Sequence, residues 1–191
     1  MQGEVAAIAR WRRLDGEGDD VCRLVREPGG WMLAGHARFA KGGVRSALDY
    51  VVWCDEGWHS LRADVSGRHD GATVGWRIRR NGSGWLLNDR PADGDRAEGC
   101  TDIDLAFTPA TNLLPLRRLR PRDGEIAVRA VWFPFPETCL RPLPQSYRRD
   151  GPGQVVYTSP DTGFSARLNV HDTGFVTLYP GLWEGEVAQD D

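Results

Sequence analysis

Apolar and polar side chains alternate at every second position along most of this sequence. Val74, Trp76 and Ile78 alternate with glycine and arginine, and the same spacing runs through Trp58–Val65 and Phe164–His171. Successive side chains of a β-strand point to opposite faces, so this period predicts strands with one buried face and one exposed face. No window shows a convincing apolar period of 3.6 residues, which argues against a helical fold.

Turn sequences rich in glycine separate these runs at intervals of about ten residues. Examples are Gly42-Gly43, Asn81-Gly82, Asp93-Gly94, Asp123-Gly124 and Asp161-Thr162-Gly163. Because such turns join antiparallel strands, we predict an all-β sheet of roughly a dozen or more strands that rolls up or partly closes as a barrel. A short helix fits only near Thr108–Leu116, where Pro109 and Pro115 limit its length.

Two runs depart from simple alternation. Leu48–Cys54 and Ile126–Phe133 are apolar on both faces over much of their length. We therefore expect each to be a central strand or to line an interior cavity. The acidic segment Glu184–Asp191 is expected to be frayed. No break in composition divides the chain, so residues 1–191 are predicted to form one domain.

The overall charge and the cysteine spacing exclude several classes of function. A net charge of −3 argues against a protein dedicated to nucleic acid. Neither a signal peptide nor a transmembrane segment is visible, so we expect a cytoplasmic protein. The four cysteines form no C-x-x-C pair and the four histidines are scattered, which indicates free thiols and no metal or other cofactor. Common catalytic motifs are also missing.

The stretch Asp102–Leu119 carries the most distinctive chemistry. Asp102 and Asp104 lie two residues apart, so a strand places both carboxylates on one face. A Thr108-Pro-Ala-Thr-Asn turn follows, and Arg117 and Arg118 come after it. Three interpretations stay open: an internal ion-pair network, recognition of a polar ligand, or a two-carboxylate hydrolase of glycosides or esters.

Aromatic residues are spread over many of the predicted strands. Most are expected in the core, but some are candidates for the wall of a pocket. The sequence alone does not sort the two groups. The set comprises Trp53, Trp58, Trp76, Trp85, Trp132, Tyr147, Tyr157, Tyr179 and Trp183.

The Asp102–Leu119 stretch resembles the signature of a bacterial glycolipid-binding family, formerly a domain of unknown function. Other pieces agree with that family in order along nearly the whole chain. They are Leu48-Asp49-Tyr50, Trp58, Gly84-Trp85, Gly99-Cys100-Thr101-Asp102, Ala130-Val131-Trp132-Phe133-Pro134, Gln145-Ser146-Tyr147, Tyr157 and Tyr179-Pro180.

The resemblance implies a spiral β-roll of about fifteen strands, similar to bacterial lipoprotein carriers. The glycolipid label comes from that similarity of fold, and the family supplies no catalytic residues. Lipoprotein carriers act outside the cytoplasm, whereas no export signal is visible here. The candidate ligand-binding residues are Asp102, Asp104, Thr108, Asn112, Arg117, Arg118, Trp132, Gln145 and Tyr147.

The leading hypothesis is a non-catalytic module with an aromatic-lined cavity for a glycolipid or another amphipathic small molecule. The alternatives are a hydrolase that uses Asp102 or Asp104, and a structural or interaction domain with no small ligand. Nucleic acid is not expected as a partner, and the sequence leaves the oligomeric state open.

Overall fold

The strands of this protein form one continuous sheet in the computed structural model, which describes residues 3–82, 84–92, 97–120 and 124–189. The strands are β1 (Glu4–Arg13), β2 (Glu17–Glu27), β3 (Gly30–Lys41), β4 (Val44–Asp55), β5 (Ser60–His69), β6 (Ala72–Asn81), β7 (Gly84–Leu87), β8 (Arg90–Pro91), β9 (Asp102–Leu105), β10 (Glu125–Phe133), β11 (Arg141–Gly151), β12 (Gln154–Ser159), β13 (Phe164–Val170), β14 (Val176–Tyr179) and β15 (Trp183–Ala188). The helices are α1 (Leu113–Arg118) and the 3-10 helices η2 (Ala110–Asn112) and η3 (Pro160–Thr162).

The order of the strands in the sheet is β8-β7-β6-β5-β4-β3-β2-β1-β15-β14-β13-β12-β11-β10-β9. Neighbours pair antiparallel except β9 and β10, which are parallel. The first and last strands, β1 and β15, pair in the middle of the sheet, with Ile8 opposite Ala188. β8 and β9 form the two edges, so the sheet does not close. The prediction of an all-β, mostly antiparallel roll is confirmed.

Tight turns explain why consecutive strands pair. Gly42 and Gly43 both have positive φ, and so do Asp70 and Gly71, as a type I′ hairpin requires. Gly82 also has positive φ in the predicted Asn81-Gly82 turn. Asp93, Gly94 and Asp123 lie outside the described residues.

The prediction for Trp58–Val65 is wrong at its beginning. Trp58 lies in a turn with a φ of 67°, and β5 starts at Ser60. Trp53 pairs with Arg62 and Cys54 with Ser60, so Leu61 is an additional residue that forms a β-bulge. Because of this bulge, Ser60 and Ala63 are both buried while Leu61 is exposed.

The C-terminal segment also differs from its prediction. Trp183–Ala188, expected to be frayed from Glu184 onward, forms β15 and pairs with β1 over six residues of each strand. Trp11 of β1 also donates a buried hydrogen bond of 2.6 Å to the carbonyl of Val176. This junction joins the N-terminal strands β1–β8 to the C-terminal strands β9–β15.

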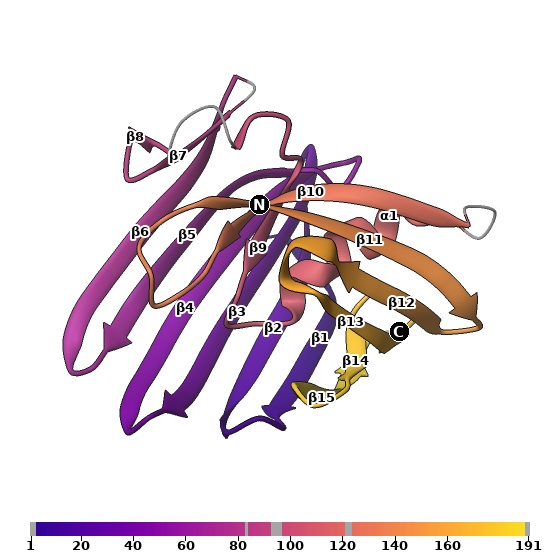
Figure 1. Ribbon diagram of the computed structural model, residues 1–191, viewed down its shortest axis with the longest axis horizontal. Helices are drawn as coiled ribbons and strands as arrows, with labels where there is room; N and C mark the ends of the chain where they lie inside the picture. Colours follow the sequence, from indigo (N-terminus) through magenta and orange to yellow (C-terminus); the bar gives the residue numbers. More distant parts are fainter. Residues whose placement is uncertain (1–2, 83, 93–96, 121–123, 190–191) are drawn as a thin grey trace.

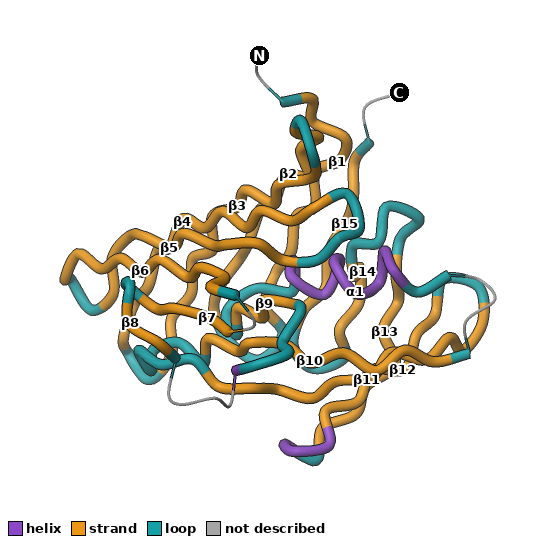
Figure 2. The backbone as a smooth tube through the Cα atoms, turned by 90° about the horizontal axis from the view of Figure 1, so that it is seen from above, coloured by secondary structure: helices purple, strands orange, loops and turns teal. Residues whose placement is uncertain are grey.

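The sheet curls so that one of its edges enters the interior. β9 and α1 lie between the layer of β1–β6 and the layer of β10–β13 (Figures 1 and 2). The backbone N–H of Ser60 in β5 donates to the carbonyl of Thr101, and the Ile103 N–H donates to Ser60 Oγ. The side chains of Ile103, Leu105 and Phe133 are fully buried. β10 keeps an exposed face at Ala127 and Arg129, and only its second half, Ala130–Phe133, is buried or partly buried on both faces. The prediction from the run Ile126–Phe133 therefore holds for that half of the strand.

The described residues contain no helix long and apolar enough to cross a membrane. Within the same residues, no cluster of three or more His, Cys, Asp or Glu side chains is arranged to hold a metal ion. The four cysteines are unpaired, and three of them are buried.

Candidate functional site

Asp102–Leu119, called the central segment below, runs through the interior of the roll. It contains β9, η2 and α1, and most of its residues are buried. Pro109 directly precedes η2, and Pro115 lies in the first turn of α1. Proline is tolerated there because the first N–H groups of a helix have no intrahelical acceptor. The helix predicted near Thr108–Leu116 therefore exists and ends at Arg118.

Asp102 and Arg118 form an ion pair inside the central segment. Arg118 Nη1 lies 2.8 Å from Asp102 Oδ1, and Nη2 lies 2.6 Å from Oδ2. Arg118 Nη1 also donates to the carbonyl of Trp58 at 2.7 Å. Only 3% of the Asp102 side chain and 17% of the Arg118 side chain are exposed. The pair joins the start of the segment to its end, so its geometry is that of a structural contact.

Arg117 does not meet the two aspartates. Its guanidinium stacks over the ring of Trp58 at 4.7 Å and donates to the carbonyls of Asp172 and Thr173. Burial lowers the pKa of Arg117. The adjacent arginines point in different directions, and only Arg118 reaches the carboxylate pair.

Asp104 lies on the same face of β9 as Asp102 but has no cationic partner among the described residues. Its Oδ2 accepts a hydrogen bond of 2.6 Å from Gln145 Nε2, which also donates to the Tyr157 hydroxyl at 3.1 Å. Burial, together with the nearby Asp102 charge, raises the pKa of Asp104 to about 6 despite the Gln145 hydrogen bond.

Asn112 and Tyr147 extend the same network. Asn112 Nδ2 donates to the Tyr147 hydroxyl at 2.9 Å, and that hydroxyl donates to Gln145 Oε1 at 3.3 Å. Burial raises the pKa of Tyr147 well above its ordinary value. The network thus connects the central segment to the inner face of β11 and β12.

A second network, which was not found in the sequence, connects the central segment to the N-terminal strands. Asp20 of β2 is fully buried and accepts hydrogen bonds from the hydroxyls of Tyr50 and Thr108. Burial raises the pKa of Asp20 to about 6, although both hydrogen bonds oppose the change. Thr108 Oγ1 also accepts from the Ala110 N–H at 3.0 Å. Asp20 gave no local signal, because its partners are 30 and 88 residues away.

A hollow of about 210 Å³ opens beside Asp104, between the central segment and the inner face of β10–β15. We call it the tyrosine hollow. Ser159 is 2% exposed, and its Oγ has no hydrogen-bond partner among the described residues. The hollow is lined by Asp104, Leu105, Ala106, Thr108, Pro109, Asn112, Trp132, Leu143, Tyr157, Ser159, Thr162, Phe164, Tyr179, Leu182 and Trp183.

A larger hollow of about 560 Å³ adjoins it and shares Ala106, Trp132, Leu182 and Trp183 with it. We call this the phenylalanine hollow, because Phe39, Phe107 and Phe135 form much of its wall. The loop after β10 completes the wall: the ring of Phe135 lies within 6 Å of the rings of Phe39, His69, Trp76 and Phe107.

Charged side chains also line the phenylalanine hollow. Arg13 forms two hydrogen bonds with the Asp15 carboxylate and lies over the rings of Phe39 and Trp183 at 5.4 and 4.9 Å. Lys41 is exposed. The two adjoining hollows therefore differ: one offers hydroxyls and a carboxyl group, and the other offers aromatic rings with charges beside them.

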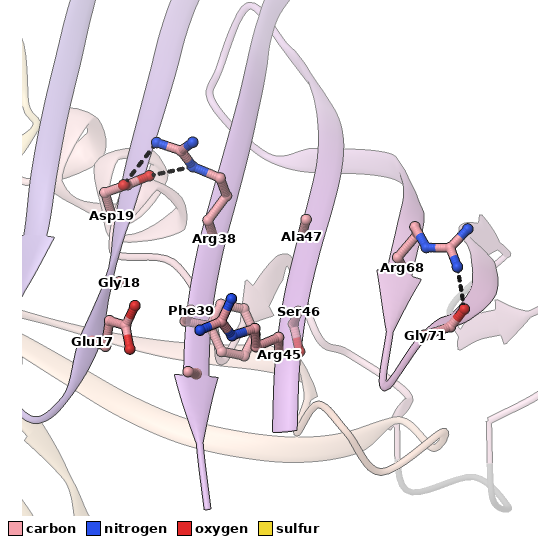
Figure 3. A pocket seen from close by; sticks show the side chains of 11 residues that line it. Glu17, Gly18, Asp19, Arg38, Phe39, Arg45, Ser46, Ala47, Arg68 and Gly71 are labelled. Carbon is pink, nitrogen blue, oxygen red and sulfur yellow. Dashed lines mark hydrogen bonds and ion pairs between the residues drawn. The ribbon is translucent and has the colours of Figure 1, made fainter. Parts of the chain in front are cut away.

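A third hollow, of about 590 Å³, lies over β2–β5 and includes Arg38, Arg45 and Arg68 (Figure 3). Arg38 forms a bidentate ion pair with Asp19, and Arg68 donates to the carbonyl of Gly71. Figure 3 shows Arg68 directed away from Arg45, so the guanidinium groups do not converge on one point. All three arginines are exposed, and we assign no site to this hollow.

The structure divides the nine predicted site residues into three groups. Asp104, Thr108, Asn112 and Trp132 line the tyrosine hollow, whereas Gln145 and Tyr147 lie behind it and hold Asp104 and Asn112 by hydrogen bonds. The side chains of Asp102, Arg117 and Arg118 line neither adjoining hollow.

The structure also sorts the aromatic residues. Trp76, Trp85 and Tyr147 are in the core, and Trp53 and Trp58 stack with arginines. Four tryptophan and tyrosine residues line the tyrosine hollow: Trp132, Tyr157, Tyr179 and Trp183. Ser159, Phe39 and Phe135 gave no sequence signal, because strands and loops far apart in the chain bring them to the hollows. Phe107 lies in the stretch that the sequence singled out, but its place in the wall of a hollow was not predicted.

Residues 8–185 match the model of the family described as "Putative glycolipid-binding". The chain is 28% identical to a DUF1089 family protein from Pseudomonas aeruginosa, with a TM-score of 0.73 over 86% of this chain and 91% of that chain. It also has the fold of a β-barrel-like protein of domain of unknown function DUF1849 from Brucella abortus, at 8% identity and a TM-score of 0.57, over 99% of this chain and 98% of that chain. Comparison with curated protein sequences finds no match.

Proposed function

This chain belongs to the glycolipid-binding family that its sequence matches, and from that premise we propose that it binds an amphipathic small molecule, such as a glycolipid, without catalysis. The ligand binds across the two adjoining hollows. Its polar end occupies the tyrosine hollow, and its apolar part lies against the rings of the phenylalanine hollow.

One observation carries the proposal: a polar hollow and an aromatic hollow share a wall. Trp132 and Trp183 belong to both. Ligand sites commonly combine apolar and aromatic walls with a few well-placed polar groups. Together the hollows fall in the range of about 300–1,000 Å³ that is usual for small-molecule sites.

The hydrolase alternative has less support from the geometry. Two-carboxylate glycosidases need both carboxyl groups free to act on one glycosidic bond. Here both oxygens of Asp102 are held by Arg118, so only Asp104 is directed at a hollow. We therefore do not assign Asp102 a role in chemistry.

Native mass spectrometry and thermal unfolding of the purified protein against a panel of lipids test the proposal. A ligand that binds only the folded state raises the unfolding temperature as its concentration passes Kd. Trp132→Ala should weaken binding, because Trp132 belongs to both hollows. Trp53→Ala is the matched control, since Trp53 is also partly buried but stacks with Arg62 and lines neither hollow.

The proposal predicts a bound lipid or a raised unfolding temperature for the unmodified protein and for Trp53→Ala, and a reduced effect for Trp132→Ala. No adduct and no shift across the whole panel would contradict it. Equal binding by the two variants would place the ligand elsewhere.

A further inference from the structure

We infer that the tyrosine hollow selects an uncharged head group that carries hydroxyls on one ring-sized unit, as a single sugar does, over anionic and quaternary ammonium head groups. This inference rests on the proposed function and names the class of head group that the hollow accepts. It makes Asp104 and Ser159 the residues that determine specificity.

Two polar groups of the hollow can form hydrogen bonds with a ligand, because each has an oxygen that bonds to no described residue. Ser159 Oγ is buried and has no hydrogen-bond partner among the described residues. Asp104 Oδ2 accepts from Gln145, while Oδ1 makes no hydrogen bond to a described residue. A buried polar atom without a partner, as Ser159 Oγ is, costs roughly 1–3 kcal/mol of desolvation, so a ligand that supplies the missing hydrogen bond gains affinity.

The charge of the hollow disfavours an anionic head group. Asp104 is the only charged side chain among the residues that line it, and none of them is Lys, Arg or His. Phosphate, sulfate and carboxylate groups are bound in proteins by arginine, lysine or groups of backbone N–H donors. An anion placed here would meet a carboxyl group and five aromatic side chains instead of a cation.

The hydroxyls of the hollow disfavour a quaternary ammonium head group. Ser159, Tyr157 and Tyr179 each carry a hydroxyl, which both donates and accepts. A quaternary ammonium group has neither a donor nor an acceptor, so it forms no hydrogen bond with Ser159 or Asp104. A ligand hydroxyl can donate to Asp104 and also accept from Ser159. A head group with hydroxyls therefore matches both residues.

The size of the hollow sets the length of the head group. Its volume of about 210 Å³ is below the roughly 300–1,000 Å³ of sites that enclose a whole drug-sized ligand. The rings of Trp132 and Trp183 provide flat apolar surface for the C–H face of a sugar ring. We therefore expect room for one ring and not for a disaccharide.

Isothermal titration with four amphiphiles of equal chain length tests the inference on the unmodified protein. The probes are octyl glucoside, octyl maltoside, octyl phosphate and octyltrimethylammonium, each below its micelle concentration. Octyl glucoside should bind at least about tenfold more tightly than the other three, which corresponds to about 1.4 kcal/mol.

Two variants then test the residues. Asp104→Asn should weaken binding of octyl glucoside by about tenfold or more, and Ser159→Ala by roughly threefold to tenfold, as expected for one charged and one neutral hydrogen bond. The matched controls are Asp70→Asn, in an exposed turn where asparagine suits a φ of 49°, and Ser66→Ala, on the exposed face of β5. Neither control should change the affinity.

Binding of octyl phosphate or octyltrimethylammonium as tight as that of octyl glucoside would overturn the inference and leave the proposed function intact. So would unchanged affinity in both Asp104→Asn and Ser159→Ala. Because the comparison of probes needs no variant, it decides the question even if Asp104→Asn does not fold. Binding of none of the four amphiphiles would contradict the proposed function and this inference together.

Discussion

Three aspartates of the interior show how differently the fold treats the same residue type. Asp102 is neutralised by Arg118, whereas Asp20 and Asp104 are held by neutral donors only. A buried carboxylate without a cation favours its protonated form, because burial removes the water that stabilises the charge. The ion pair joins two parts of the scaffold, while the raised pKa values of Asp20 and Asp104 make the stability depend on pH.

Arg118→Ala should lower the free energy of unfolding by about 3–5 kcal/mol, because it leaves the buried Asp102 carboxylate without its partner. Arg117→Ala is the matched control and should cost only about 1 kcal/mol, since Arg117 stacks on Trp58 and bonds to carbonyls alone. Urea unfolding measures both. Equal losses of free energy of unfolding in the two variants would show that the ion pair stabilises the fold no more than the contacts of Arg117 do.

The free energy of unfolding should fall as the pH rises from 3.8 to about 6, through the contribution of Asp20. Below 3.8 the carboxyl is neutral in both states. Between the two values the unfolded chain ionises first, which favours unfolding, and above about 6 the contribution stays constant. A rise of about two pH units in the pKa corresponds to at most about 3 kcal/mol.

Asp20→Asn isolates this contribution, because other carboxyl groups also titrate in the same range. The difference in free energy of unfolding between the unmodified protein and Asp20→Asn should decrease from pH 4 to pH 6 and then level off. Urea unfolding at several pH values gives this difference. A difference that stays constant with pH, or increases, would contradict the role assigned to Asp20.

At the scale of single residues, the sequence predicted the type of contact better than the partner. Two aspartates and two arginines in one segment indicated an ion pair, and one exists. The choice of Arg118 depends on α1, which rotates the adjacent arginines apart, and on the position of Trp58. Gln145 and Tyr147 were singled out with Asp104 and Asn112, but their hydrogen bonds depend on how β11 lies against the central segment.

At the scale of elements, alternation predicted strands well wherever pairing is regular. In β6, Trp76 and Ile78 are buried, and in β13 Leu168 is buried, as their positions indicated. The prediction failed where a neighbour imposes an irregularity. The bulge at Leu61 depends on the register between β4 and β5, and the pairing of the acidic C-terminal residues depends on β1. Neither contact leaves a local pattern in the sequence.

Gly35→Ala tests how closely β3 and β4 approach each other. A Cβ at position 35 would lie 2.3 Å from the ring and hydroxyl of Tyr50, which is buried and donates to Asp20. Overpacking of this kind costs about 1–3 kcal/mol, and displacement of Tyr50 also disturbs its hydrogen bonds. We expect a loss of at least about 2 kcal/mol in urea unfolding.

Gly75→Ala on β6 is the matched control, because its Cβ would meet nothing closer than the Val65 carbonyl at 3.8 Å. Its effect should stay within about 0.5 kcal/mol, as for other exposed positions. If the two substitutions had the same effect, the close approach of Tyr50 to Gly35 would not limit the packing.

At the scale of the whole molecule, two features hold the roll together: the β1–β15 junction and the central segment. The junction pairs residues about 180 positions apart, and the central segment bonds to both layers of the roll. The sequence predicted a meander of the right size, because each hairpin is local. It did not reveal the β1–β15 junction. Any two strands can pair, so no local pattern identifies which distant strand is the partner.

A circular permutant tests whether this architecture or the chain order determines the fold. The end of β15 lies beside β1 because Ala188 pairs with Ile8, so a flexible linker of about twelve Gly and Ser residues can join Gln189 to Gly3. New ends between Asp70 and Gly71 fall in an exposed turn, and β5 and β6 on either side still pair along their length. This permutant should fold, with an unchanged near-ultraviolet circular dichroism spectrum and unchanged binding of octyl glucoside.

A second permutant with the same linker, opened between Ala110 and Thr111, is its control. That cut divides η2, so Thr108 and its contacts with the N-terminal strands are separated from Asn112 and its contact with β11. It also separates Asp102 from Arg118 along the chain. We expect this protein to be unfolded or strongly destabilised. If it folded as well as the first permutant, the continuity of the central segment would not be needed to hold the two layers together.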